Sequence, residues 1–181
     1  MTMRRILIAA ITMASCLASM TAGAVWPFSS GPQDIQVTSV TDVDLKDQPQ
    51  LEWVSLKPRP SKIIYRIEFT TNMDLLALAK KNDYNISFAL GPCGAGGVKD
   101  IGLGYGYVYW NKLRIYSDAK VTPDYSAEVA KGPPFTYQVF ATKWRPSSIK
   151  GSMCFTLAGG SMLGERLRSN VAVIPNDQQT H

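Results

Sequence analysis

Few side chains in this sequence could carry acid–base or metal chemistry. The only histidine is His181, the last residue, so any Ser-His-Asp, Cys-His or histidine–metal mechanism would depend on the chain end. Glu68 lies in the strand-like run 62–70, where alternation places it on one face with Ile64 and Arg66. We interpret Glu68 as a cross-strand partner. The sequence predicts no catalytic residue, no metal site and no cofactor.

Tyr105, Tyr107 and Tyr109 are the best candidates for a binding surface. They recur at every second residue of the run 105–116, so in a strand they would line one face. Tyrosine combines a large rigid surface with a polar tip, which suits recognition of sugars or proteins. The alternative is that the opposite face is the core and the tyrosines simply cover the outer side of the sheet. If the tyrosine face is itself core, the rings contact no partner.

Cys93 and Cys154 are placed to form a disulfide bond. The chain has three cysteines, and the third, Cys16, lies within an apolar N-terminal run. In an oxidising compartment an isolated pair favours one bridge, which would close a loop of about 60 residues and stabilise the fold by about 4 kcal/mol. Two buried free thiols are the alternative. The spacing matches neither a CxxC redox motif nor a cysteine-rich zinc site.

Residues 1–24 are typical of a secretory signal peptide. A basic start at 1–5 precedes an apolar run at 6–18 and a small-residue cleavage signal at 22–24. The apolar run has 13 residues, whereas a spanning helix needs about 20, so we expect no transmembrane span in the mature chain. Cleavage after Ala24 is the expected processing. The alternative is a lipid anchor at Cys16, because residues 13–16 loosely resemble a bacterial lipobox.

The charge pattern argues against nucleic acid as a partner. The chain has 19 basic and 14 acidic residues, and removal of Arg4 and Arg5 leaves 17 basic ones. Apart from pairs at 80–81 and 166/168, the basic residues are scattered singly. A nucleic-acid-binding protein concentrates them on one face or helix, so we expect a mixed, solvated surface.

Short apolar runs separated by turn residues predict a mainly β fold. Strand-like patterns cover 34–45, 51–56, 62–70, 84–90, 105–116, 135–144, 152–157 and 169–174. One short helix is predicted at 73–81, after the capping pattern Thr71-x-x-Asp74, whereas 121–131 is ambiguous. About eight strands and one helix favour an antiparallel β-sandwich with immunoglobulin-like features. A small closed barrel is the main alternative.

The predicted organisation is a signal peptide at 1–24, a flexible segment at 25–33, one β-sandwich domain at 34–175 and a polar tail at 176–181. We expect a non-catalytic binding or accessory protein of the bacterial envelope, periplasmic or secreted, that recognises a protein or envelope component. The alternatives are an outer-membrane lipoprotein or surface-structure assembly subunit, and a hydrolase that uses carboxylates alone.

Overall fold

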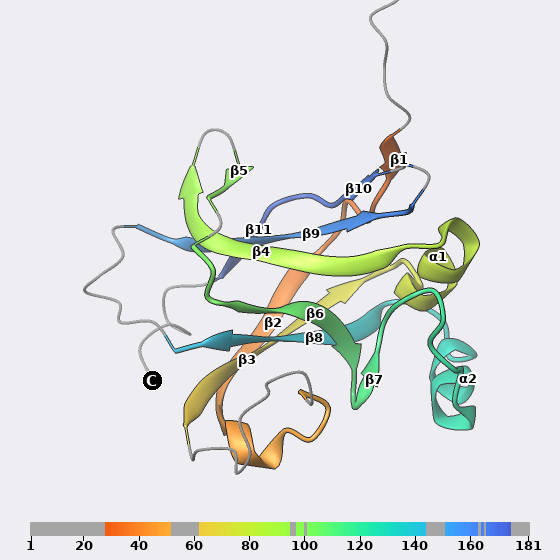
Figure 1. Cartoon of the computed structure of the whole chain (residues 1–181), viewed down its shortest axis with the longest axis horizontal. Helices are drawn as coiled ribbons and strands as arrows, with labels where there is room; N and C mark the ends of the chain where they lie inside the picture. The colour runs from red at the N-terminus through yellow and green to blue at the C-terminus, as the bar shows by residue number, and fades with distance from the viewer. Residues whose placement is uncertain are drawn as a thin grey trace, which may run out of the picture.

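The computed structural model describes residues 28–51, 62–94, 97–99, 101–143, 151–162, 164 and 166–174. Within these ranges 50% of the residues are in strands and 15% in helices, so the fold is mainly β, as predicted. The strands form two antiparallel sheets, accompanied by two α-helices (Figure 1).

The first sheet contains six strands. They are β1 (Phe28–Ser30), β4 (Asn85–Gly94), β5 (Gly97–Val98), β9 (Met153–Gly160), β10 (Arg166–Arg168) and β11 (Ala172–Ile174). Strand β9 pairs with β4 on one side, and β10 and β11 follow one another along its other side. Strand β1 runs parallel to β10, whereas the other described pairs of this sheet are antiparallel.

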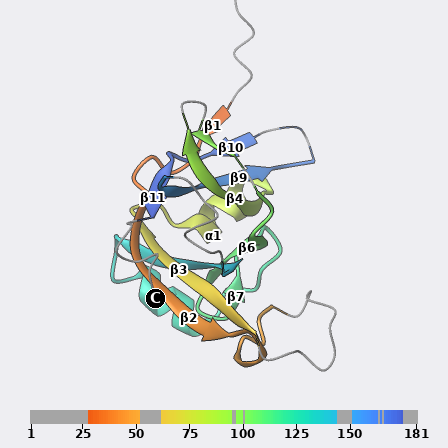
Figure 2. The same ribbon diagram turned by 90° about the vertical axis from the view of Figure 1, so that its left-hand side faces the viewer.

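The second sheet contains five strands, all antiparallel. In spatial order they are β2 (Gln36–Asp44), β3 (Ile63–Thr71), β8 (Phe135–Thr142), β6 (Gly104–Trp110) and β7 (Leu113–Arg114). A 3-10 turn, η1 (Leu45–Asp47), follows β2, and the helices are α1 (Leu75–Asn82) and α2 (Pro123–Val129). Figures 1 and 2 show this sheet lying across the first one, with both helices at one end.

The two sheets share one hydrophobic core. The rings of Phe69 on β3 and Phe155 on β9 are 5.2 Å apart between centroids, which joins the inner faces of the sheets. Alternate residues of four strands point into this core because strand side chains alternate between faces. They include Ile67 and Phe69 of β3, Ile86, Phe88 and Leu90 of β4, Val139 of β8, and Phe155 and Leu157 of β9.

A smaller core lies on the opposite face of the second sheet. Ile64, Tyr109 and Phe140 point away from the main core, and the Tyr109 and Phe140 rings meet edge to face at 5.6 Å. Leu45 and Leu51, from the segment that contains η1, pack against them. The segment 45–51 therefore covers one end of this outer face and leaves the rest of it to be lined by other residues.

The predicted helix is confirmed as α1, with Asp74 as its N-cap. The Asp74 carboxylate accepts hydrogen bonds from the backbone N–H groups of Leu76 and Ala77, each at 3.0 Å. The expectation of a single helix is wrong, because the ambiguous segment 121–131 contains α2. The Thr122 side chain caps α2, and Pro123 occupies its first turn, where no N–H is needed.

Residues 28–33, within the segment expected to be flexible, lie along β10. The Gln33 side-chain amide donates to the Arg168 carbonyl at 3.1 Å, and the Asn170 backbone N–H donates to the Pro32 carbonyl at 3.1 Å. These bonds add to the parallel pairing of β1 with β10. The predicted signal peptide, the polar tail and the candidate strand 51–56, except Leu51, fall outside the described residues.

The predicted disulfide is confirmed. Cys93 of β4 and Cys154 of β9 are bonded, and their sequence separation is 61. A structural bridge of this kind is consistent with an extracytoplasmic protein. Of the helices described, neither is long and apolar enough to cross a membrane.

Candidate functional site

The outer face of the second sheet carries a polar floor beside the smaller core. Ile67 points into the main core, so its neighbours Arg66 and Glu68 point outward from β3. Gln138 lies opposite Glu68 in the register of β3 and β8, and Thr136 lies two residues away on the same face. Strand alternation and register therefore gather four polar side chains from two adjacent strands.

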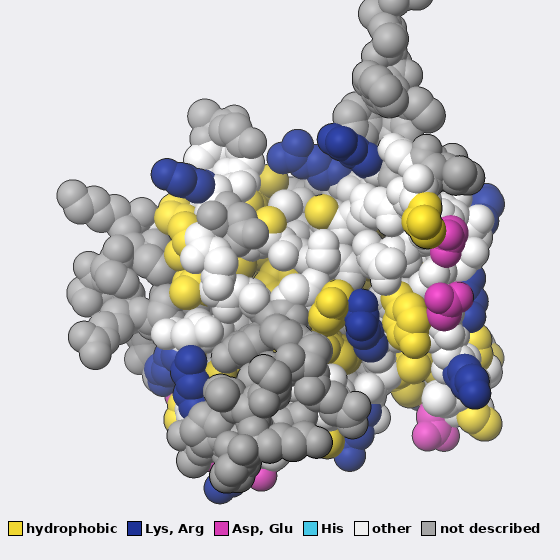
Figure 3. Space-filling view, viewed as in Figure 1, with side chains coloured by type: hydrophobic (Ala, Val, Ile, Leu, Met, Phe, Trp, Pro, Cys, Tyr) yellow, Lys and Arg dark blue, Asp and Glu magenta, His cyan; other side chains and the backbone are white. Residues whose placement is uncertain are grey.

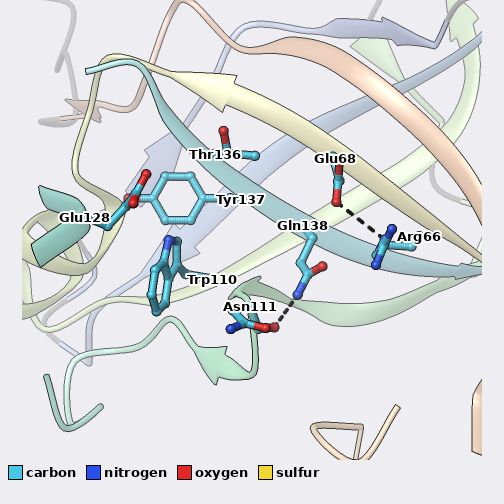
Figure 4. A pocket seen from close by; sticks show the side chains of 8 residues that line it. All are labelled: Arg66, Glu68, Trp110, Asn111, Glu128, Thr136, Tyr137 and Gln138. Atoms are coloured by element: carbon cyan, nitrogen blue, oxygen red, sulfur yellow. Dashed lines mark hydrogen bonds and ion pairs between the residues drawn. The ribbon is translucent and has the colours of Figure 1, made fainter. Parts of the chain in front are cut away.

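Residues from β6 and α2 turn this floor into a groove. Trp110 ends β6, Asn111 begins the turn to β7 with a left-handed φ of 51°, and Glu128 extends from α2. The open depression that they line measures about 350 Å³, within the range of small-ligand pockets. We call it the polar groove (Figure 4) and define it by Arg66, Glu68, Trp110, Asn111, Glu128, Thr136, Tyr137 and Gln138.

The charges within the polar groove are paired with one another or with close neighbours. Arg66 Nε lies 3.5 Å from Glu68 Oε1, and the Ser39 hydroxyl donates to Glu68 Oε2 at 2.9 Å. Lys131 Nζ lies 2.7 Å from Glu128 Oε2. Figure 4 shows the Arg66–Glu68 pair at one side of the groove and Glu128 at the other. A ligand therefore meets charged side chains that already have partners of opposite charge.

Amide and aromatic groups fill the space between these charges. The Gln138 side-chain amide donates to the Asn111 carbonyl, which fixes its orientation across the floor. The Trp110 ring packs edge to face on Tyr125 of α2, with centroids 5.1 Å apart, and remains half-buried in the groove wall. The groove thus combines a positioned apolar ring with planar hydrogen-bonding side chains.

A buried network fixes the helices that border the groove. The Tyr125 hydroxyl donates to Asp74 Oδ1 at 2.5 Å and lies 3.1 Å from the Tyr137 hydroxyl. The Leu75 backbone N–H donates to that Tyr137 hydroxyl at 2.9 Å. Side chains of α1, α2 and β8 are therefore joined at one point, which holds Glu128 on α2 at the groove edge.

Both tyrosines of this network are held in the neutral form. Burial is the main cause for Tyr137, whose pKa is raised to about 12. Burial also raises the pKa of Tyr125, and the nearby Tyr137 hydroxyl and Asp74 carboxylate raise it further. The network therefore runs from the Tyr137 hydroxyl through the Tyr125 hydroxyl to the Asp74 carboxylate, and it serves structure at ordinary pH.

Of the three tyrosines predicted as a recognition surface, the structure describes the side chains of Tyr107 and Tyr109. Tyr109 is 0% exposed in the smaller core, because residues 45–51 cover it, so its ring cannot contact a partner in this structure. Tyr107 is half-buried, with the Arg114 guanidinium 3.4 Å from its ring centroid. The Tyr105 side chain lies outside the described residues. The interpretation of Glu68 as a cross-strand partner is confirmed by its bond to Ser39 on β2.

A second depression, of about 720 Å³, lies between residues 31–34 and α1. Its two carboxylates are engaged in the fold, since Asp74 caps α1 and Asp34 accepts from the Thr71 hydroxyl and the Asn72 N–H. Burial acts to raise the pKa of Asp34, but these hydrogen bonds outweigh it and lower the pKa. We therefore place the candidate site in the polar groove, whose polar groups face the cavity.

Comparison with family models, curated proteins and solved structures finds no match to this chain. Within the part of the chain that the structure describes, no group of three or more metal-ligating side chains is present.

Proposed function

We propose that this chain is an exported, non-catalytic binding protein of the bacterial envelope, periplasmic or secreted, that recognises a protein or envelope component. The two sheets would serve as an immunoglobulin-like β-sandwich framework that presents the polar groove. The observation that carries the proposal is the groove itself, where Trp110 and the side chains of β3, β8 and α2 line one cavity.

The groove suits a ligand segment that is polar but carries no strong net charge. Its cations and carboxylates already neutralise one another in the Arg66–Glu68 and Lys131–Glu128 pairs. Each charge of a highly charged ligand would be attracted by one member of a pair and repelled by the other, which leaves little net attraction. Hydroxyl or amide groups can instead bond to Gln138 and Thr136 while an apolar surface packs on Trp110.

A carboxylate-dependent hydrolase is less well supported. Glycoside hydrolysis needs one carboxylic acid kept protonated by apolar surroundings and a second carboxylate as base or nucleophile. Glu68 accepts a hydrogen bond and pairs with Arg66, and Glu128 pairs with Lys131. Both carboxylates are thus paired with cations, and neither is enclosed by apolar side chains.

The proposed location rests on two independent features. The N-terminal pattern at 1–24 is that of a secretory signal. The Cys93–Cys154 bridge suits a compartment where thiols oxidise. The chain would reach that compartment before it folds around the disulfide.

The proposal is tested by blocking the groove. Thr136 is exposed on the groove floor, and Thr38 is exposed on β2 outside the groove. Thr136→Arg should fill the groove with little cost to folding, and Thr38→Arg is the matched control. We expect envelope material captured by the mature protein to be lost with T136R and kept with T38R, as read by mass spectrometry for proteins and sugar analysis for glycans.

Equal capture by the wild-type, T136R and T38R proteins would place recognition outside the groove. Release of a cleaved product from envelope material by the wild-type protein, abolished by Glu68→Gln, would contradict the non-catalytic assignment.

A further inference from the structure

Acidic residues are distributed unequally between the two sheets. The described part of the chain contains ten of them, and none lies in a strand of the first sheet. That sheet instead carries Arg166 and Arg168 on β10, and Lys99 follows β5 directly. In Figure 3 blue side chains lie along the upper edge, over β5 and β10, and also beside the helices and at the lower edge, whereas magenta ones are seen only beside the helices and at the lower edge.

Arg166 and Arg168 point to the outside of the first sheet. Leu167 between them is 2% exposed and belongs to the main core, so strand alternation directs both arginines outward. Neither arginine forms an ion pair with a described residue. Glu165, next to Arg166, and Asp100, next to Lys99, lie outside the described residues.

Exposed aliphatic side chains continue the same edge. Val171, just before β11, is 40% exposed, and Val173, within β11, is 55% exposed. Met162, in the turn between β9 and β10, is 97% exposed. A Cβ placed on Gly97 of β5 would lie 3.2 Å from Arg168 Nη2 and 3.9 Å from Val171 Cγ2, so cation and aliphatic groups adjoin one another. We define the basic-aliphatic edge as Lys99, Met162, Arg166, Arg168, Val171 and Val173.

We propose that the basic-aliphatic edge docks this protein on an anionic lipid surface. Cations attract the phosphates of anionic headgroups, and exposed aliphatic side chains gain by entering the interface beside them. The described strands of the first sheet carry these cations with no carboxylate among them. Docking through this edge would leave the polar groove, on the outer face of the second sheet, free to bind its own ligand.

The expected binding is weak and salt-dependent. Each cation held near an anionic membrane strengthens partitioning by roughly fivefold, so loss of two arginines should weaken it about 25- to 30-fold. Because headgroup attraction is screened over about 10 Å at 0.1 M salt, raising the salt should release the protein. Zwitterionic vesicles should retain little of it, since the aliphatic contribution alone is small.

The test is cosedimentation of the mature protein with vesicles of phosphatidylglycerol and phosphatidylcholine, and with phosphatidylcholine alone. The test variant is R166Q/R168Q. The matched control is K112Q/K120Q, which removes the same charge from two exposed lysines in the chain between β6 and α2. R166K/R168K keeps the charge, and near-ultraviolet circular dichroism checks that each variant folds.

We expect anionic vesicles to bind the wild-type, control and lysine-substituted proteins, and to bind R166Q/R168Q about 25-fold or more weakly. Equal losses in the control and test variants would show non-specific charge attraction and overturn the assignment. Binding that is absent, unaffected by lipid charge, or detected only to an envelope protein would overturn it too. T136R should bind vesicles normally, so failure of the groove proposal is separable from failure of this one.

Discussion

Removal of the Tyr125 hydroxyl should destabilise the fold although the side chain keeps its shape. The hydroxyl donates to the Asp74 carboxylate at 2.5 Å and lies 3.1 Å from the Tyr137 hydroxyl. A hydrogen bond to a charged group is worth roughly 1.5–3 kcal/mol. Tyr137 is 1% exposed, so its hydroxyl would also lose a partner that water does not readily replace. We expect Tyr125→Phe to lower the free energy of unfolding by about 2–3 kcal/mol.

Urea denaturation followed by tryptophan fluorescence measures this loss. Tyr116→Phe is the control, because the described residues show no hydrogen bond to its hydroxyl and its side chain is only half-buried. The double variant Tyr125→Phe/Asp74→Asn should lose clearly less unfolding free energy than the sum of the two single variants, because both changes disrupt the same hydrogen bond. A loss below about 0.5 kcal/mol for Tyr125→Phe, or strictly additive losses with Asp74→Asn, would show that this network does not stabilise the fold.

Three further predictions concern the smaller core, alkaline pH and the disulfide. Tyr109→Ala should lower the free energy of unfolding by about 3–5 kcal/mol in denaturant titrations. Tyr107→Ala, at a half-buried site, should cost much less, and equal losses would contradict the core assignment. The Tyr137 pKa of about 12 lies above the value near 10 for an unfolded chain. The neutral Tyr137 hydroxyl therefore contributes its full share to the free energy of unfolding below about pH 10. This share is lost as the pH rises toward 12, and the loss reaches about 2–3 kcal/mol for a pKa difference of about two units. Denaturation at rising pH should show this fall in the wild-type protein and a smaller one in Tyr137→Phe, and a flat profile in both would count against it. Joint replacement of Cys93 and Cys154 by alanine should cost about 4 kcal/mol. Equal electrophoretic mobility with and without reductant, together with alkylation of both thiols in the native protein, would disprove the bridge.

The local elements were predictable where one pattern dominates. Strand β3 was expected at 62–70 and occurs at Ile63–Thr71, because alternating β-branched and aromatic residues fit a half-buried pleated surface. Helix α1 was expected for its cap and apolar face. Helix α2 was missed although Thr122 and Pro123 are ordinary start signals, since the segment is short and carries only one fully buried side chain, Tyr125.

The sequence did not predict which chain segments pack on each face of a sheet. Alternation correctly separates Val108 from its neighbours Tyr107 and Tyr109, but it does not say which face lies under another segment. The packing of Leu45 and Leu51 on Tyr109 depends on residues far away in the sequence. For that reason the pattern could not show that Tyr109 lies in a second core.

The polar groove shows the same limit. The sequence placed Glu68 and Arg66 on one face of one strand, and this part of the site is present. Gln138 joins them through the register of β3 with β8, and Trp110 through the pairing of β8 with β6. Pairing of strands distant in the sequence is a tertiary property that no local pattern contains.

Photo-cross-linking in the native cell can show directly whether the polar groove is the recognition site. A photoreactive phenylalanine derivative placed at Thr136 would report contacts in the groove, and the same residue at Thr38 would report contacts at the exposed edge of the same sheet. We predict one dominant envelope adduct from position 136 that is absent from position 38. Identical adducts from both positions, or none from 136, would contradict recognition through the groove.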